Sequence, residues 1–237
     1  MAHQTVFKRN ELKYMITIDQ KKRILKTINK YMQLDKYGRT TIRNIYFDTP
    51  NYRLIRRSIE KPAYKEKLRI RSYKLAEDDS IVFIEVKKKY DSIVYKRRIA
   101  IPLNDAMDMV CNKNKLNNET QISNEISYFI SFYENLQPSV FLSYEREAYF
   151  CLENTDLRIT FDENILYRDY DLDLCKDAYG DLVLEKGYSM MEIKCSYGMP
   201  LWLTKLLSEE HIYKTSFSKY GTAYQMIFKK NKEKEGK

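Results

Sequence analysis

The stretch YKEKLRIRSYK, residues 64–74, constrains the fold of this 237-residue chain more than any other. Because successive side chains of a β-strand point to opposite faces, the stretch separates into a basic face and a mostly apolar face. The basic face holds Lys65, Lys67, Arg69 and Arg71, and the other face holds Tyr64, Glu66, Leu68 and Ile70. The same alternation recurs in FIEVKKK, YEREAYF, LRITFD and MMEIK. One such charged face usually lies in solvent, but its repetition predicts a sheet rolled up with its charges inward, around a polyanion.

The charge balance of the chain favours an anionic partner. Lys and Arg number 42 against 33 Asp and Glu, which gives a formal net charge of +9. Nucleic acid, a membrane surface and phosphate compounds all fit this balance. We expect no nucleic acid, because many of the tyrosines fall on predicted apolar faces or in helices and no helix has a clustered basic stripe.

The terminal and apolar patterns predict where the chain resides. The N-terminus, MAHQTVFKRN, has no apolar signal region, and no stretch approaches 18 uninterrupted apolar residues. We therefore expect a cytoplasmic, soluble chain without a transmembrane segment. Without an internal repeat or a low-complexity segment, we expect a single domain over residues 1–237, with a core over about residues 5–228 and a charged tail over 229–237.

Periodicity predicts an antiparallel α+β fold with eight strands. The strands are expected at about residues 6–15, 41–48, 64–74, 81–89, 93–101, 140–151, 157–162 and 188–195. Helical patterns are expected after Asp19 and near residues 51–60, 104–110, 119–136, 200–210 and 219–228. Eight strands can close into a barrel whose interior holds side chains or one ligand. The prediction is therefore a closed eight-stranded β tunnel with flanking helices.

The charged residues that share strand faces form the candidate site. By parity, this set is Glu11, Lys13, Arg69, Arg71, Glu85, Lys87, Lys96 or Arg97, Tyr144, Arg146, Arg158, Asp162, Glu192 and Lys194. Enclosing so many cations would be costly without a counter-charge, and a phosphate chain supplies one. Carboxylates beside a phosphate can bind Mg²⁺ or Mn²⁺. A single R-x-R or E-x-K motif is usually solvent-facing, so the prediction rests on the repetition.

Eight short motifs in order resemble those of the VTC domain, the polyphosphate polymerase branch of the CYTH-like triphosphate tunnel metalloenzymes. They are ELKY from Glu11, YFD from Tyr46, KLRIR from Lys67, EVK from Glu85, YEREA from Tyr144, RITFD from Arg158, MEIK from Met191 and FSKY from Phe217. Together they cover about residues 5–228. The resemblance implies an antiparallel eight-stranded tunnel flanked by helices.

The resemblance also implies roles for individual residues. The cations that would line the tunnel and hold phosphates are Lys13, Arg69, Arg71, Lys87, Lys96, Arg146, Arg158, Lys194 and Lys219, with Arg69, Arg71, Arg146, Arg158 and Lys219 as the catalytic set. Tyr144 and Ser218 would add hydroxyl contacts. Glu192 would be the main ligand of Mn²⁺ or Mg²⁺.

The implied activity is a metal-dependent polyphosphate polymerase that transfers the γ-phosphate of ATP to a growing polyphosphate chain. The E-x-E-x-K motif of the hydrolytic branch is replaced here by R-N-E-L-K, which favours the polymerase. Two alternatives remain open. One is a tunnel hydrolase of tripolyphosphate, nucleoside triphosphate or RNA 5′-triphosphate. The other is a polyanion-binding module without turnover.

Overall fold

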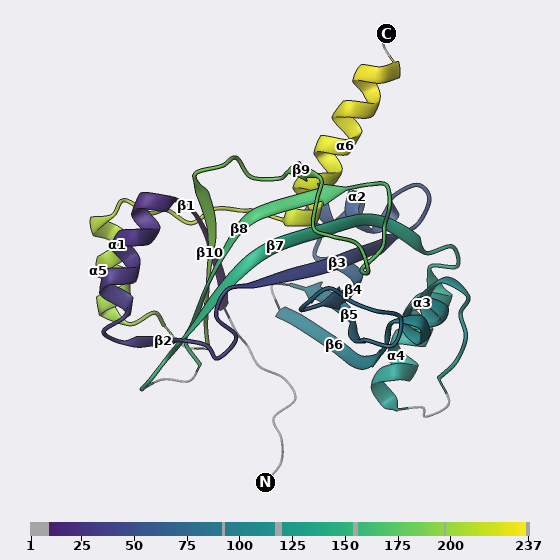
Figure 1. Cartoon of the computed structure of the whole chain (residues 1–237), viewed down its shortest axis with the longest axis horizontal. Coiled ribbons are helices and arrows are strands. Elements are labelled where there is room, and N and C mark those ends of the chain that lie inside the picture. The colour runs from purple at the N-terminus through teal and green to yellow at the C-terminus, as the bar shows by residue number, and fades with distance from the viewer. Residues whose placement is uncertain (1–9, 92, 117–119, 154–155, 197, 236–237) are drawn as a thin grey trace. The chain divides into compact units, whose positions relative to one another are not determined.

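The computed structural model describes residues 10–91, 93–116, 120–153, 156–196 and 198–235 (Figure 1). The strands are β1 Asn10–Thr17, β2 Met32–Leu34, β3 Thr40–Asp48, β4 Tyr64–Ser72, β5 Ile81–Tyr90, β6 Ile93–Pro102, β7 Gln137–Cys151, β8 Arg158–Arg168, β9 Asp181–Leu182 and β10 Tyr188–Cys195. The helices are α1 Ile18–Ile28, α2 Arg53–Ile59, α3 Leu103–Cys111, α4 Gln121–Phe132, α5 Leu201–Glu209 and α6 Lys219–Glu235. Residues 6–9 of the first predicted strand, and residues 236–237 of the predicted tail, lie outside the described residues. The antiparallel α+β class is confirmed, and most of the predicted tail continues α6.

The sheet does not close into the eight-stranded barrel that we expected. Its strands pair in the order β1-β10-β8-β7-β3-β4-β5-β6, with β2 beside β7 and β9 beside β8. In the part of the chain that is described, β1 and β6 do not pair with each other. The outer edge of β1 instead meets a later segment, because Tyr14 bridges to Lys214 and the Thr215 amide donates to the Lys13 carbonyl at 2.8 Å. That segment takes the place that a closing strand would need.

The chain divides into two compact units. Unit 1 comprises Met1–Thr41, Tyr144–Ile165 and Leu184–Phe217, and unit 2 comprises Ile42–Ser143, Leu166–Val183 and Ser218–Lys237. The long strands β7 and β8 contribute residues to both units. The single domain expected from the sequence stays a prediction.

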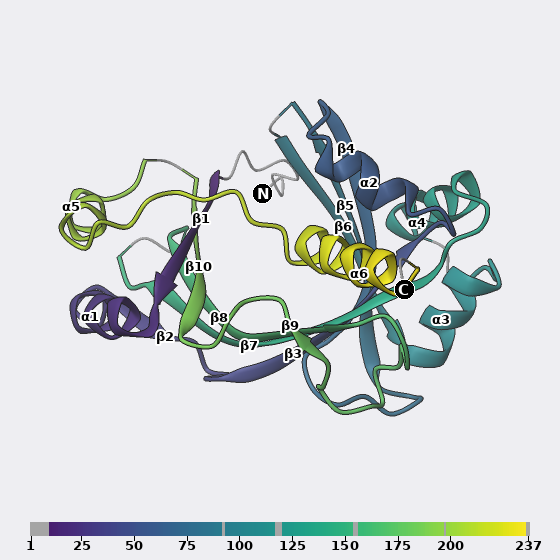
Figure 2. The ribbon, with the colours of Figure 1, turned by 90° about the horizontal axis from the view of Figure 1, so that it is seen from above.

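Unit 1 buries the apolar faces of its strands under α1 and α5, which lie side by side (Figure 2). Thr17 begins α1 with a capping box, in which its hydroxyl accepts from the Gln20 amide and the Gln20 side chain accepts from the Thr17 amide. The resulting core contains Ile16, Ile24, Phe161, Met191 and Leu203, among others. The faces of β1, β8 and β10 that this core does not use are therefore the ones that carry charge.

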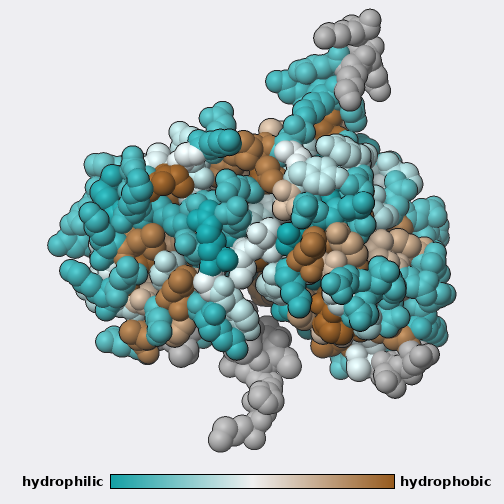
Figure 3. Space-filling view, in the orientation of Figure 1, coloured by the Kyte–Doolittle hydropathy of each residue, from teal (hydrophilic) through white to brown (hydrophobic). Residues whose placement is uncertain are grey.

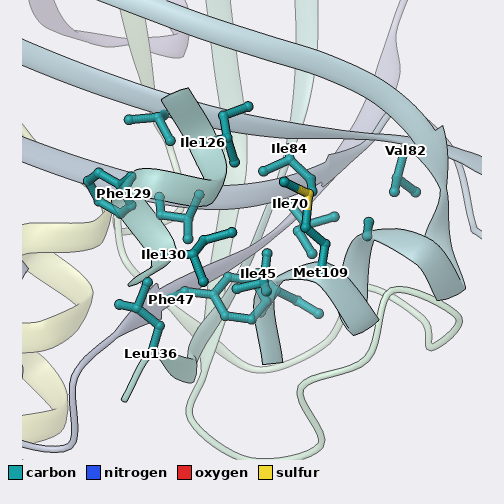
Figure 4. Packing of buried hydrophobic residues seen from close by; sticks show 14 of the residues in the cluster. Ile45, Phe47, Ile70, Val82, Ile84, Met109, Ile126, Phe129, Ile130 and Leu136 are labelled. Carbon is teal, nitrogen blue, oxygen red and sulfur yellow. The ribbon is translucent and has the colours of Figure 1, made fainter. Parts of the chain in front are cut away.

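Unit 2 packs α3 and α4 against the apolar faces of β3, β4 and β5 (Figure 4). Ile45, Ile70 and Ile84 point from three adjacent strands toward Met109 of α3 and Ile130 of α4. The alternation expected for residues 64–74 is confirmed here, because Leu68 and Ile70 are fully buried on this face. Glu66 lies on the same face, where the hydroxyls of Tyr64 and Tyr133 donate to its carboxylate.

The surface is largely polar. On the face shown in Figure 3, hydrophilic residues cover most of the surface and hydrophobic residues gather in separate patches. None of the described helices has the length and apolar character needed to cross a lipid bilayer.

Candidate functional site

The first group of candidate residues lies on one face of β3, β4, β5 and β6 in unit 2. The strand register places Arg69 opposite Tyr46 and Glu85, and Glu85 opposite Arg98. One step along, Lys87 lies opposite both Lys67 and Lys96. We call this the unit 2 charged face, and its members are Asn44, Tyr46, Lys67, Arg69, Arg71, Phe83, Glu85, Lys87, Lys96 and Arg98. It is the side of these strands that α3 and α4 leave uncovered.

A buried carboxylate organises this face. Glu85 has a side-chain exposure of 2%, and four cations surround it. Arg69 Nη2 lies 2.7 Å from Glu85 Oε2, and Lys96 Nζ lies 2.7 Å from Glu85 Oε1. Arg71 Nη1 and Arg98 Nε are farther away, at 3.8 and 3.6 Å. One negative charge is therefore shared among four positive charges, and the cluster keeps a net positive charge.

The electrostatics of the cluster fix Glu85 in its ionised form. Burial alone would raise the pKa of Glu85, but Arg69, Arg71 and Lys96 together hold it well below its usual range. The pKa of Lys96 is lowered, because burial and the neighbouring Arg69 and Arg71 outweigh the attraction of Glu85. An anion bound beside Lys96 would raise the pKa of Lys96 again. The cluster therefore favours the binding of a negatively charged ligand.

Further hydrogen bonds hold the two arginines of β4 in place. Arg69 Nη1 donates to the Tyr46 hydroxyl at 2.9 Å, and the Tyr46 ring stacks on that of Tyr220, with ring centres 4.5 Å apart. Arg71 Nε donates to Asn44 Oδ1 at 2.9 Å, and Asn44 Nδ2 donates to the Leu142 carbonyl at 2.9 Å. These contacts orient the guanidinium groups before any ligand binds.

The start of α6 is anchored to the same unit. The Tyr220 hydroxyl donates to Asp48 Oδ2 at 2.9 Å, and Asp48 also accepts the backbone amides of Leu54 and Ile55 at the start of α2. This anchor places Ser218, whose hydroxyl accepts from Lys67 Nζ at 2.9 Å. Lys219 follows directly as the first residue of α6.

The second group of candidate residues lies on one face of unit 1. The register pairs Glu11 with Lys194 and Lys13 with Glu192, and it places Lys194 opposite Arg158. Arg146 belongs to the same face, because its guanidinium binds the carboxylate of Asp162. We call this the unit 1 charged face, and its members are Glu11, Lys13, Tyr144, Arg146, Arg158, Asp162, Glu192 and Lys194. The opposite faces of these strands carry the core residues Tyr14, Ile159 and Ile193.

Positive and negative side chains alternate on this second face. Arg146 donates from Nε and Nη2 to the two carboxylate oxygens of Asp162, at 2.6 and 2.7 Å. The guanidinium of Arg146 lies 5.0 Å from the centre of the Tyr144 ring. Lys13 Nζ donates to the Phe217 carbonyl at 2.8 Å, and Arg158 is exposed. The positive charge of each cation that has a carboxylate partner on this face is therefore largely neutralised by that partner.

Glu192 is the residue expected to bind a metal ion. Lys194 Nζ lies 3.8 Å from Glu192 Oε1 and 3.9 Å from Glu11 Oε1, so two carboxylates flank one ammonium group. Among the described residues, no group of three or more His, Cys, Asp or Glu side chains is arranged to hold a metal ion. Mg²⁺ is commonly bound through one or two carboxylates, with substrate phosphates and water supplying the remaining ligands. The donor set fits an ion that binds together with a phosphate substrate.

The structure assembles the predicted residues in two groups. Arg69, Arg71, Lys87, Lys96, Ser218 and Lys219 belong to unit 2, and Lys13, Tyr144, Arg146, Arg158, Glu192 and Lys194 belong to unit 1. The choice that the sequence left open between Lys96 and Arg97 is settled, because Lys96 contacts Glu85 whereas Arg97 binds Glu125 of α4 at 2.5 Å. Sequence reasoning missed Arg98, although it has the same parity as Lys96. It also missed the supporting roles of Asn44 and Tyr46.

Comparison with known proteins agrees with this architecture. A family model of the VTC domain matches residues 8–228. A candidate adenylate cyclase from Bacillus halodurans is similar in fold, with a TM-score of 0.54 at 14% identity over 88% of this chain and 92% of that one. A candidate adenylate cyclase from Vibrio parahaemolyticus gives a TM-score of 0.52 at 15% identity over 92% of this chain and 98% of that one. Comparison with curated proteins gave no match. The motifs, the two charged strand faces and the extent of the family match together place this chain in the VTC domain family.

Proposed function

We propose that this protein is a polyphosphate polymerase that transfers the γ-phosphate of ATP to the end of an inorganic polyphosphate chain, with Mn²⁺ or Mg²⁺ as cofactor. Membership of the VTC domain family supports a role in phosphate transfer. The observation that carries the proposal is the cluster around Glu85, where four cations share one buried carboxylate. Such an excess of ordered positive charge favours a ligand with several adjacent negative charges.

The transfer requires no nucleophilic side chain. A terminal phosphate oxygen of the polyphosphate chain attacks the γ-phosphorus, a new P–O bond forms, and the bond to the β-phosphate oxygen breaks to release ADP. The attacking oxygen is already ionised at neutral pH. Catalysis of phosphoryl transfer consists mainly of positioning and charge neutralisation, which the cations of the unit 2 charged face can provide.

Residues in both groups have proposed roles. Arg69 and Arg71, held by Tyr46 and Asn44, would bind phosphate oxygens in fixed orientations. Arg146, Arg158 and Lys219 complete the proposed catalytic set. Lys13, Lys87, Lys96, Tyr144, Lys194 and Ser218 complete the proposed substrate contacts.

The proposed cofactor site is Glu192, with Glu11 beside it. A bound Mn²⁺ or Mg²⁺ would neutralise charge on the phosphate oxygens of the substrate. Lys194, which lies between the two carboxylates, would keep them close together before the ion binds. ATP and inorganic polyphosphate are the proposed partners, and the cytoplasmic location expected from the sequence stays a prediction.

The decisive experiment is to incubate the purified chain with ATP and Mn²⁺ and to separate the products on a gel. Long phosphate chains are the expected product. Arg69→Ala should strongly reduce the yield of long chains, whereas Arg57→Ala, which removes an exposed arginine on α2, should not. Free phosphate as the sole product would identify a hydrolase instead. Binding of polyphosphate without any product would identify a non-catalytic binding module.

A further inference from the structure

Two aromatic rings lie at one end of the unit 2 charged face. Phe83 is on β5, two residues before Glu85, and Tyr73 directly follows the end of β4. Their ring centres are 5.5 Å apart and the ring planes meet at 77°, an edge-to-face arrangement. Tyr73 is 40% exposed, so part of its ring remains open to a ligand.

Two guanidinium groups border these rings. The guanidinium carbon of Arg98 lies 3.5 Å from the centre of the Phe83 ring and 5.6 Å from that of Tyr73. The guanidinium carbon of Arg71 lies 5.8 Å from the centre of the Tyr73 ring. Aromatic rings and guanidinium planes are the two kinds of surface on which nucleic acid bases stack. The end of this face therefore combines both kinds next to the cation cluster.

The spacing between the rings and the cation cluster suits a nucleotide. Phe83 and Glu85 point to the same side of β5 and are separated by two residues, which is about 7 Å along a strand. A ligand whose phosphates contact Arg69 and Lys96 would therefore have its next chemical group, the sugar and base, within reach of the rings. A linear phosphate chain without a base would have no group to place there.

We propose that Tyr73, Phe83 and Arg98 form a stacking platform for the base of the nucleoside triphosphate that donates the phosphate. The proposal rests on the proposed function, because it requires the donor's phosphates to bind the unit 2 charged face. A stacking surface accepts any base, since every base has an aromatic face, and it favours purines because they offer more area. The rings would then allow the enzyme to distinguish its two substrates, because the nucleoside triphosphate carries a base and the phosphate chain does not.

A simpler role for the rings is to cover the apolar stem of Arg98. In that case, removing the Tyr73 ring would affect a nucleotide and a base-free phosphate chain alike. The two roles differ in one measurable quantity, the affinity for ATP relative to the affinity for inorganic tripolyphosphate. Both ligands carry three linked phosphates, and only ATP carries a base.

The test is to titrate the full chain and its variants with ATP and with tripolyphosphate in a calorimeter. Tyr73→Ala should weaken ATP binding by roughly 5- to 150-fold, the usual contribution of one stacked base, and leave tripolyphosphate binding unchanged. Tyr73→Phe should retain the wild-type ratio of affinities. Tyr128→Ala is the matched control, because Tyr128 is a 69% exposed tyrosine of α4 in the same unit.

Each outcome bears on one of the two proposals. If Tyr73→Ala changes both affinities equally, or neither, the stacking platform is wrong and phosphate binding by the cluster still stands. If the wild-type chain does not bind tripolyphosphate, the proposed function fails, whatever Tyr73→Ala does to ATP binding. Should Tyr73→Ala prevent folding, Tyr73→Leu keeps a bulky apolar side chain without an aromatic face and should give the same selective loss.

Discussion

The two charged faces differ in how their charges are balanced. Among the described residues that define the unit 2 charged face, Glu85 is the single carboxylate, and the cations are Lys67, Arg69, Arg71, Lys87, Lys96 and Arg98. On the unit 1 charged face, the carboxylates Glu11, Asp162 and Glu192 accompany the cations Lys13, Arg146, Arg158 and Lys194. The first face therefore has a large excess of positive charge, whereas the second is nearly neutral.

Under the proposed function, this difference would divide phosphate binding and metal binding between the two faces. An excess of cations around a buried carboxylate favours an anionic ligand, because the ligand supplies the missing negative charge. A face with carboxylates beside lysines can also bind a cation, such as a divalent metal ion. If the proposed function holds, this comparison predicts phosphate binding mainly on the unit 2 charged face and metal binding on the unit 1 charged face.

The largest expected effect comes from removing the carboxylate at the centre of the unit 2 cluster. Glu85→Gln keeps the shape of the side chain but removes the negative charge that four cations contact. Breaking a buried ion pair in this way usually costs about 3–5 kcal/mol of stability. Chemical denaturation should show that loss. An unchanged unfolding free energy would mean that the cations do not depend on Glu85.

A comparison of one arginine from each face should give the next largest effect. Arg69→Ala removes a guanidinium that is oriented by both Glu85 and Tyr46. By analogy with the loss of one oxyanion donor, kcat for chain synthesis should fall about 100- to 1000-fold. Arg158→Ala removes an exposed member of the proposed catalytic set, on the unit 1 charged face, and should also lower kcat, but by less than Arg69→Ala. Equal losses would argue against a division of tasks between the faces.

Acid should weaken the unit 2 cluster through Glu85. The folded-state pKa of Glu85 is depressed, so its stabilising contribution is complete above the unfolded value of about 4.3 and is lost as the pH falls toward the folded value. Each unit of depression corresponds to about 1.4 kcal/mol. The melting temperature of the wild-type chain should therefore fall as the pH drops below about 4.3. It should fall less for Glu85→Gln, which lacks the titrating carboxyl group. Parallel pH profiles for the two proteins would contradict this account.

The smallest expected change in stability follows from Glu192→Gln on the unit 1 charged face. The distance from Glu192 to Lys194 is long, at 3.8 Å, so the unfolding free energy should change by about 1 kcal/mol or less. Activity should instead require a higher Mn²⁺ concentration for half its maximum. A Mn²⁺ titration of the rate measures this directly. An unaltered titration curve would exclude Glu192 as a metal ligand.

Much of the fold follows from strand alternation, but strand ends do not. The prediction for residues 157–162 stopped too early, because β8 continues to Arg168 beyond the polar pair Glu163 and Asn164. Asn164 has a positive φ of 47°, so the backbone departs from regular geometry there and the alternation is interrupted. The buried Arg168 then stacks on Phe141 and donates to the carbonyls of Asp171 and Tyr179, an arrangement without a sequence signature.

By itself, the sequence determined which side chains share a face. The two-residue period of a strand depends only on neighbouring residues, so it can be recognised in stretches such as residues 64–72. The tertiary structure alone decided whether the sheet closes, since this depends on which distant segment occupies the edge of β1. It also decided that Glu85, and not another carboxylate, lies buried among four cations. That choice depends on the register between β4, β5 and β6, and register is set by pairing between strands rather than by any one of them.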